Sequence, residues 1–287
     1  MVGVPVSDAT QGEQIERVAD GAYPVCEQLK TLAAPGDVIY QDDTQVRIVS
    51  LMAANRQAHA ESVPGGRTGM STTGLVVQQG AHTICLSLAG RAHAGEHLAA
   101  LLAWREAGRD KPLVRSDALV RNTAEEAALL RCHCLAHGRR QCAEVEDVFP
   151  AACTVVLEAL AQVFDQEEES RVQQRSPAAR FASPHPSSGP LMEALQHWLA
   201  QQCEDRTVEP NSSLGKALQY LRIQWQPLTR FLQVERAPLE NNIVERAFKL
   251  AIRQRQNSRL YATDDSASIA SMLTSLIATC LHAGVNA

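Results

Sequence analysis

The sequence predicts an α/β fold in which a mixed β-sheet is flanked by helices and interrupted by a largely helical insertion. Three observations lead to this prediction. Short β-rich runs follow one another between residues 37 and 88, helix and strand patterns alternate from there to residue 142, and the pattern from 143 to about 235 is helical. With 287 residues, 45% hydrophobic and 21% charged, the chain suffices for one or two domains with a sizeable core.

The chain begins with a predicted helix at residues 8–34. Thr10 and Glu13 have the spacing of a capping box, and Pro35-Gly36 ends the helical pattern. Apolar residues recur at helical spacing along this segment, at Ile15, Val18, Ala22, Val25, Leu29 and Leu32. We therefore expect a helical lead-in over residues 1–35.

Four short runs rich in β-branched and apolar residues come next. They are DVIYQ at 37–41, VRIVSL at 46–51, TGLVVQQ at 73–79 and HTICLSL at 82–88, with a turn-rich loop at Pro64-Gly65-Gly66. We interpret this region as an antiparallel meander of three strands.

Helix and strand patterns alternate after the meander. HAGEHLAALLAWREAG at 93–108 has the period of a helix, and KPLVRSD at 111–117 is typical of a short buried strand. A further helical stretch leads to RCHCLAH at 131–137, which predicts a fifth strand. Residues 36–142 are thus expected to form the first part of the sheet domain.

The region 143–235 is predicted to be a helical, acidic insertion. A Ser/Pro-rich break at 176–190 has the composition of a flexible loop. The sheet domain is expected to resume at 236–287. There Pro238 is a favourable first helical position, and a final apolar helix is predicted at about 266–283.

The formal net charge of −5 argues against a strongly basic, histone-like DNA coat. Residues 143–210 carry 12 acidic and 4 basic side chains, so the remainder of the chain is mildly basic. The chain has no apolar run near the roughly 20 residues of a membrane span and no signal-peptide pattern at its start. We therefore expect a cytoplasmic protein with no membrane partner, whose eight scattered cysteines are reduced.

Two aspartates stand on predicted strands, one at the middle or end of the first strand and one at the end of a buried strand, although acidic residues are poor strand formers. Asp42 lies in IYQDDT, and Asp117 ends KPLVRSD 75 positions later. Because side chains alternate across a strand, Asp42 and Asp43 point to opposite faces and only one of them can join a given site. Strand ends that meet in a sheet could bring Asp42 and Asp117 together. The alternative is a turn or helix-capping aspartate at each position.

A third carboxylate, Glu245, lies on the helix predicted after Pro238. At 100° per residue, apolar side chains gather on one side of this helix and Glu245 lies near the opposite side with Lys249. Asn241 and Asn242 are weak helix formers, so their place in the first turn suggests hydrogen bonding or capping. The alternative is an ordinary surface ion pair between Glu245 and Lys249.

The same segment is rich in basic residues and has no acid between 246 and 259. Its basic side chains are Arg246, Lys249, Arg253, Arg255 and Arg259. Arg131, Arg139 and Arg140 add positive charge. A basic stripe beside a carboxylate suits a site that holds a phosphate backbone while metal ions occupy the acids. The alternative is a solvated basic face.

Cys132, Cys134, His137 and Cys142 raise the question of a zinc site. Their spacing matches none of the usual paired-ligand patterns, and the first two cysteines fall on a predicted buried strand, where cysteine acts as a small apolar residue. We therefore expect no zinc in this chain. His137, at the end of that strand, could lie near the acids or make a structural hydrogen bond. The sequence has no G-x-S-x-G, Walker or G-x-G-x-x-G motif.

Eight blocks of the sequence, taken in order, resemble the C-terminal catalytic region of bacterial transposases of the insertion sequence 66 family. They are GVPVSDAT at 3–10, VIYQDDT at 38–44, RTGM at 67–70, SDALVRN at 116–122, RCHCLAHGRR at 131–140, VEPNSSLGKAL at 208–218, APLENNIVERAFKLAIRQRQNS at 237–258 and SLIATCLHAGVN at 275–286. Together they span nearly the whole chain, so the resemblance is far more specific than any one block.

This resemblance implies an RNase H-like fold with an Asp-Asp-Glu metal site. The family's pattern places the three acids at Asp42, Asp117 and Glu245, and makes 143–235 an insertion before the helix that carries the glutamate. It further implies two Mg²⁺ (or Mn²⁺) ions and phosphoryl transfer, that is, DNA strand cleavage and strand transfer.

The implied partners are transposon-end and target DNA, and a transposase oligomer. Arg246 and Lys249 would steady the DNA phosphates, and His137 would help to shape the site. Family members also carry N-terminal DNA-recognition segments that this chain lacks. The competing hypothesis is therefore a non-catalytic, truncated remnant or accessory subunit that only contacts DNA or a partner transposase.

Overall fold

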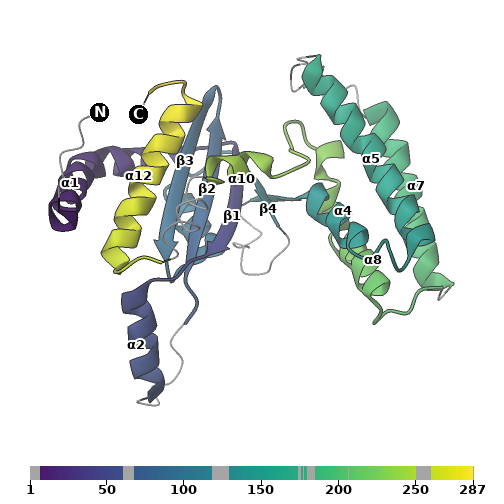
Figure 1. The fold of residues 1–287 in the computed structure, drawn as a ribbon. Helices are drawn as coiled ribbons and strands as arrows, with labels where there is room; N and C mark the ends of the chain where they lie inside the picture. The colour runs from purple at the N-terminus through teal and green to yellow at the C-terminus, as the bar shows by residue number, and fades with distance from the viewer. Residues whose placement is uncertain are drawn as a thin grey trace. The chain divides into compact units, whose positions relative to one another are not determined.

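The computed structural model describes residues 7–60, 68–117, 129–173, 176, 178–179, 185–205, 207–249 and 260–286. The chain divides into two compact units. The first is built from the described residues up to Pro112 and from Asn242 onward, and the second from β4 and the residues between Leu130 and Asn241. The fold is α/β, and its mixed five-stranded sheet has the strand order β3-β2-β1-β4-β5, which confirms the predicted fold class at this level (Figure 1).

The first unit holds the antiparallel part of the sheet. Its elements are α1 (Asp8–Ala33), β1 (Val38–Gln45), α2 (Val49–Ala60), β2 (Ser71–Gln79), β3 (His82–Gly90), α3 (Ala94–Leu102), α10 (Asn242–Ala247) and α12 (Asp264–His282). β2 pairs with β1 on one side and β3 on the other. The apolar run at 75–77 in β2 is fully buried, because both faces of this central strand are covered. The predicted meander of three strands is confirmed.

The prediction of β structure for VRIVSL at 46–51 is wrong. Ile48 makes only an isolated bridge to Tyr261, and α2 starts at the next residue, with Met52 N–H donating to Ile48 O at 2.9 Å. The backbone of Val46 donates instead to Met70 O at 3.2 Å. The apolar side chains of this run reach the core from an irregular segment, which a periodicity of two does not distinguish from a strand.

Helix ends also differ in detail from the sequence expectations. α1 is capped by Ser7, whose Oγ accepts from Thr10 N–H at 3.2 Å, so Thr10 is not the capping residue. α10 begins at Asn242 and not at Pro238, because the carbonyl of Leu239 accepts from Leu135 N–H at 3.0 Å and holds this segment outside the helix. The final helix, α12, matches its prediction closely.

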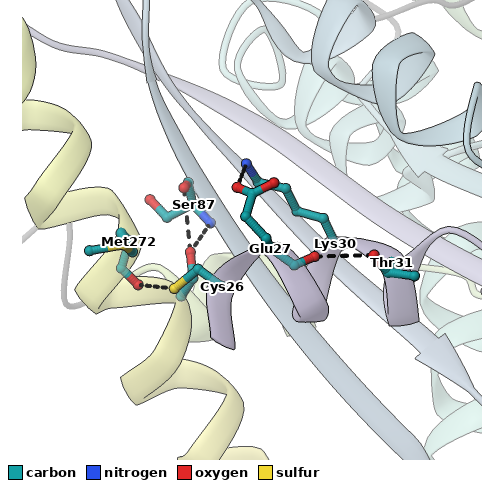
Figure 2. Close-up of polar contacts among 7 residues, drawn as sticks. Cys26, Glu27, Lys30, Thr31, Ser87 and Met272 are labelled. Carbon is teal, nitrogen blue, oxygen red and sulfur yellow. Dashed lines mark hydrogen bonds and ion pairs between the residues drawn. The ribbon is translucent and has the colours of Figure 1, made fainter. Parts of the chain in front are cut away.

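Helix α12 lies along β3, the outermost strand, with α1 beside it (Figure 1). Ser275 Oγ accepts from Ser87 N–H at 2.7 Å, and Thr279 Oγ1 accepts from Cys85 N–H at 3.0 Å and donates to Cys85 O at 3.2 Å. Residues four apart on a helix and two apart on a strand are both separated by roughly 6–7 Å along the axis, so the two spacings match. The side-chain hydroxyls of α12 therefore make hydrogen bonds with backbone groups of β3 that have no neighbouring strand as a partner, as at Ser87 (Figure 2).

The second unit is mainly helical. Its elements are β4 (Leu113–Ser116), β5 (Leu130–His133), α4 (Leu135–Ala143), α5 (Pro150–Val172), α7 (His185–Glu204), α8 (Ser213–Ile223), α9 (Trp225–Leu228) and the 3₁₀ helix η3 (Arg230–Leu232). β4 and β5 are parallel. Apolar side chains of α4, α5, α7 and α8 form one core, with Leu160, Leu199 and Leu218 almost fully buried. This confirms the helical character predicted for 143–235.

Two local predictions in this unit are wrong. The Ser/Pro-rich break was expected to run to residue 190, but α7 starts at His185 and contains Pro190. The fifth strand was expected to reach His137, but β5 ends at His133 and α4 begins two residues later.

In the described part of the chain, no helix is long and apolar enough to cross a membrane, and every cysteine whose side chain is described is a free thiol.

Candidate functional site

Asp42 lies in the middle part of β1, and its side chain is half-buried. Its cross-strand partner on β2 is Gly74. Directly opposed residues of an antiparallel pair project to the same face of the sheet. The face that bears Asp42 is therefore also the face on which Gly74 leaves room for a neighbour. One carboxylate oxygen of Asp42, Oδ1, accepts from Asp43 N–H at 2.9 Å.

Asp43 projects to the other face and both of its oxygens are engaged. Thr73 Oγ1 donates to Asp43 Oδ1 at 2.5 Å, and the backbone N–H of Ala94 donates to Oδ2 at 3.1 Å. Ala94 is the first residue of α3, so the carboxylate also faces the positive end of that helix. Asp43 is thus a structural residue that ties β1 to β2 and α3. This confirms that the two neighbouring aspartates belong to opposite faces.

Helix α10 covers the face that bears Asp42. A Cβ atom added at Gly74 would come within 2.4 Å of Phe248 Cδ2, so the Phe248 ring occupies the space over Gly74. Phe248 N–H donates to Val244 O at 3.0 Å, and both side chains are buried. Because Phe248 stacks over the residue opposite Asp42, the end of α10 lies on the same sheet face as Asp42.

The polar side of α10 carries the predicted glutamate and the first basic residues. Glu245, Arg246 and Lys249 are exposed, whereas Val244 and Ala247 are buried. Since the apolar side is anchored on β1 and β2, the helix that covers the Asp42 face presents a carboxylate and two basic side chains to solvent. Arg253, Arg255 and Arg259 lie outside the described residues.

Asp117 directly follows β4 in the second unit and is half-buried. The preceding Ser116 accepts through its carbonyl from Cys134 N–H at 3.2 Å, which continues the parallel pairing to the start of α4. Tyr220 of α8 has a pKa raised to about 12, first by burial and then by the charges of Cys134 and Asp117. The Tyr220 phenol is therefore protonated at pH 7, and the negative charge of Asp117 contributes to this.

His137 lies in the first turn of α4, whose N-cap residue is Cys134. Burial raises the pKa of the Cys134 thiol, but a hydrogen bond with His137 and the charge of Arg115 outweigh that effect and leave the pKa lowered. His137 thus interacts with Cys134 within the second unit. A role beside the metal-binding acids stays a prediction.

Sequence reasoning missed two buried polar residues near the end of the parallel strands. Arg115 on β4 is 1% exposed, and His133 on β5 is 4% exposed. The pKa of His133 is lowered to about 4, mainly by burial and then by the charges of Arg115 and Arg131, so the imidazole is neutral at pH 7. A strand buried on both faces has no polar side, which is why alternation in KPLVRSD gave no signal for Arg115.

The remaining predicted residues have varied surroundings. Asn241 is buried immediately before α10, and Asn242 is the first residue of that helix. Arg139 and Arg140 are exposed on α4, where Arg140 Nε lies 2.8 Å from Glu144 Oε1. An exposed pair of this kind contributes little to stability. Both arginines therefore remain accessible to a polyanion, as the DNA-binding prediction requires.

In the part of the chain that the structure describes, no three His, Cys, Asp or Glu side chains are gathered closely enough to hold an ion. The carboxylate triad of Asp42, Asp117 and Glu245 therefore stays a prediction. Of the cysteines considered for zinc, those at 132, 134 and 142 are buried free thiols.

Comparison with known proteins gives the class of protein. The chain belongs to a family of transposases, and the matching family model, described as transposase IS66 family, covers residues 92–269. That range includes Asp117 and Glu245 and starts after Asp42. The family assignment made from sequence blocks is confirmed.

A relative is the uncharacterized protein y4jD of Sinorhizobium fredii (strain NBRC 101917 / NGR234). It is 30% identical over 168 residues, which are 58% of this chain and 32% of that protein. The matched part of the chain thus spans about a third of the length of this curated relative.

Proposed function

We propose that this chain is the catalytic core of a DDE-type transposase, which cleaves and joins DNA strands in a reaction that depends on divalent metal ions. Asp42, Asp117 and Glu245 supply the three carboxylates. The observation that carries the proposal is the packing of Phe248 over Gly74, which puts the helix bearing Glu245 on the sheet face of Asp42. Membership of the transposase family supports it independently.

The donor set fits a hard divalent cation. Mg²⁺ and Mn²⁺ prefer carboxylate oxygens, and such oxygens are carried by Asp42 on β1 and by Glu245 on the helix that covers the same sheet face. Asp43 does not compete as a ligand, because Thr73 and Ala94 occupy both of its oxygens. When bound, two such ions activate the attacking hydroxyl or water and stabilise the leaving oxygen of the scissile phosphate.

The basic residues bind and orient the DNA backbone. Arg246 and Lys249 are exposed beside Glu245 on the side of α10 that faces away from the core. We assign them, with Arg253, to phosphate contacts next to the acids. Arg139 and Arg140 on α4 supply a further positive surface. Such contacts release counterions, so the affinity for DNA decreases as the salt concentration rises.

The finer fold assignment belongs to the same proposal. Three antiparallel strands followed by a parallel pair support an RNase H-like sheet, with 143–235 as an insertion before the helix of Glu245. The protein would act in the bacterial cytoplasm on nucleoid DNA, within a transposase oligomer, with Asn241, Asn242 and His137 in supporting positions.

The decisive experiment measures DNA nicking and strand joining. The purified chain is incubated with Mn²⁺ and with a duplex that carries the ends of the element flanking its gene. We expect products from the wild type and none from Asp42→Asn, Asp117→Asn or Glu245→Gln. A matched control is Glu240→Gln, which alters an exposed glutamate just before α10 and should leave cleavage unchanged.

The opposite result identifies the competing function. If the three acid variants cleave as well as the wild type, or if metal produces no cleavage while DNA or a partner transposase still binds, the chain is a non-catalytic accessory protein. Unfolding curves of each variant show whether a loss of activity reflects a loss of structure.

A further inference from the structure

Helix α10 is held on the sheet by two buried side chains that flank Glu245 in the sequence. Val244, directly before the glutamate, is fully buried. Phe248, three residues after it, is 7% exposed, and its N–H donates to Val244 O at 3.0 Å. Because a helix of six residues is not stable without tertiary contacts, these two side chains fix where α10 lies.

The Phe248 ring rests directly on the backbone of β2. A Cβ atom added at Gly74 would lie 2.4 Å from Phe248 Cδ2, 2.5 Å from Cε2 and 2.9 Å from Cγ. Carbon atoms in van der Waals contact are about 3.5–4.0 Å apart, so only glycine lets the ring come this close to the strand. The size of the ring therefore sets the height of this end of α10 above the sheet.

Glu245 lies beside this contact on the helix surface. At about 100° per residue it is roughly 60° from Phe248 around the helix axis, whereas Arg246 is roughly 160° away. Glu245 thus borders the buried side of α10. The strand partner of Gly74 is Asp42, and partners in an antiparallel pair have their Cα atoms about 4.5–5.5 Å apart. A shift of the ring over Gly74 therefore moves Glu245 relative to Asp42.

We propose that Phe248 is a positioning residue, whose contact with Gly74 sets the place of Glu245 relative to Asp42. The inference rests on the proposed function, in which these two carboxylates bind metal. Phe248 supplies no donor atom and acts only through α10. Residues that hold metal ligands in place commonly change metal affinity when they are replaced.

The first test measures the binding of Mn²⁺ alone to the full chain, from the electron paramagnetic resonance signal of the unbound ion. Phe248→Leu leaves a gap over Gly74, so we expect the Kd for Mn²⁺ to rise about 10-fold. Leu98→Val is the matched control, because it shortens a buried side chain of α3, on the Asp43 face, and should leave the Kd unchanged. Unchanged Mn²⁺ binding in Phe248→Leu overturns the positioning role.

A double-variant cycle with Glu245 separates positioning from a general loss of structure. In a Glu245→Gln chain there is no carboxylate to position, so adding Phe248→Leu should change the Kd by less than about 2-fold. If Phe248 only stabilised the fold, the same loss of affinity would appear with and without the glutamate. That result overturns the proposal.

The strand side of the contact gives a second perturbation, which serves if Phe248→Leu alone does not fold in urea denaturation. Gly74→Ala pushes the ring away from β2 and should also weaken Mn²⁺ binding. In Gly74→Ala/Phe248→Leu the smaller side chain leaves room for the added methyl group, so part of the affinity should return. A double variant that binds Mn²⁺ more weakly than either single variant overturns the proposal.

Failure of this inference differs from failure of the proposed function. A wild type that binds no Mn²⁺ and cleaves no DNA contradicts both. A wild type that binds Mn²⁺ and cleaves, with the same Mn²⁺ dependence as Phe248→Leu, contradicts only the positioning role of Phe248.

Discussion

The neighbouring aspartates Asp42 and Asp43 have different surroundings on the two faces of the β1–β2 pair. On one face, the carboxylate of Asp43 accepts hydrogen bonds from Thr73 and from the first N–H of α3. On the other face, Asp42 lies opposite Gly74, beneath the end of a helix that presents Glu245 to solvent. Two identical side chains in adjacent positions thus have different surroundings: Asp43 ties β1 to β2 and α3, and Asp42 lies on the face that α10 covers.

This difference shows how an acidic dipeptide should be interpreted on a strand. Because alternation separates the two carboxylates, what covers each face decides which acid is structural. A helix whose N-terminus points at an aspartate supplies backbone N–H groups, which donate hydrogen bonds to the carboxylate. Helix α10 instead meets the sheet through the apolar side chain of Phe248, which packs over Gly74 and supplies no hydrogen-bond donor to Asp42.

The largest effect is expected from filling the space over Gly74. Gly74→Ala would force the Phe248 ring and α10 to shift, at a cost of about 1–3 kcal/mol in the free energy of unfolding. Gly69→Ala is the matched control, because nothing lies within 4 Å of a Cβ there. Urea denaturation measures both. Replacing Phe248 by Leu in the Gly74→Ala chain should recover part of the loss, and strictly additive losses would contradict the packing described.

Removing the structural acid comes next in size. Asp43→Ala leaves the Thr73 hydroxyl and the Ala94 N–H without their acceptor, so we expect a loss of about 2 kcal/mol in the free energy of unfolding. Denaturation of the variant against the wild type at pH 7 provides the measurement. Unchanged stability would show that the Asp43 face is not held by this carboxylate.

A smaller effect concerns His97 of α3. Its pKa is lowered from 6.5, first by burial, while the negative charges of Asp43 and Glu96 oppose the shift. The unfolded chain therefore binds a proton at this position before the folded chain does, so the free energy of unfolding should decrease as the pH falls through 6.5. Asp43→Asn removes an opposing charge and should lower the pKa of His97 further.

The measurement for His97 is a series of urea titrations between pH 7.5 and 5.5. Comparison with His97→Gln isolates the contribution of this side chain, since the variant lacks the titrating group. An equal pH dependence in His97→Gln and in the wild type would exclude His97 as the source.

The smallest change in stability is expected from Asp42→Asn. Asparagine retains an oxygen that can accept from Asp43 N–H, and the site is half-exposed, so the free energy of unfolding should change by about 0.5 kcal/mol or less. The same variant should abolish cleavage in the proposed function. A loss as large as that of Asp43→Ala would assign both aspartates to the fold and remove the contrast between the faces.

Much of the fold was predictable from local patterns. The three antiparallel strands, α1 and α12 follow from periodicity and turn residues, because each pattern reflects local geometry. The side that α1 buries did not follow, since the small residues Ala19, Cys26 and Ala33 are buried while larger apolar residues of the helix are about half exposed. Apolar spacing identifies a helix, but only tertiary structure shows which neighbour each side meets.

The candidate site was predictable in part for the same reason. Alternation alone separates Asp42 from Asp43, and the structure confirms that they lie on opposite faces. The place of α10 on the Asp42 face depends on the packing of Phe248 over Gly74, and these residues are 174 positions apart in the sequence. A pattern read over a short stretch of sequence cannot include both. Arg115 and His133 escaped notice because long-range packing buries them.

The hydroxyl groups of α12 have a consequence for assembly. An outermost strand with free backbone groups is a template on which another chain can add a strand. Ser275 and Thr279 occupy the groups of Ser87 and Cys85 on β3, and the helix body excludes any strand from that side. Helix α12 thus covers the free edge of the sheet at β3. Growth of the sheet by strand addition is therefore blocked at β3.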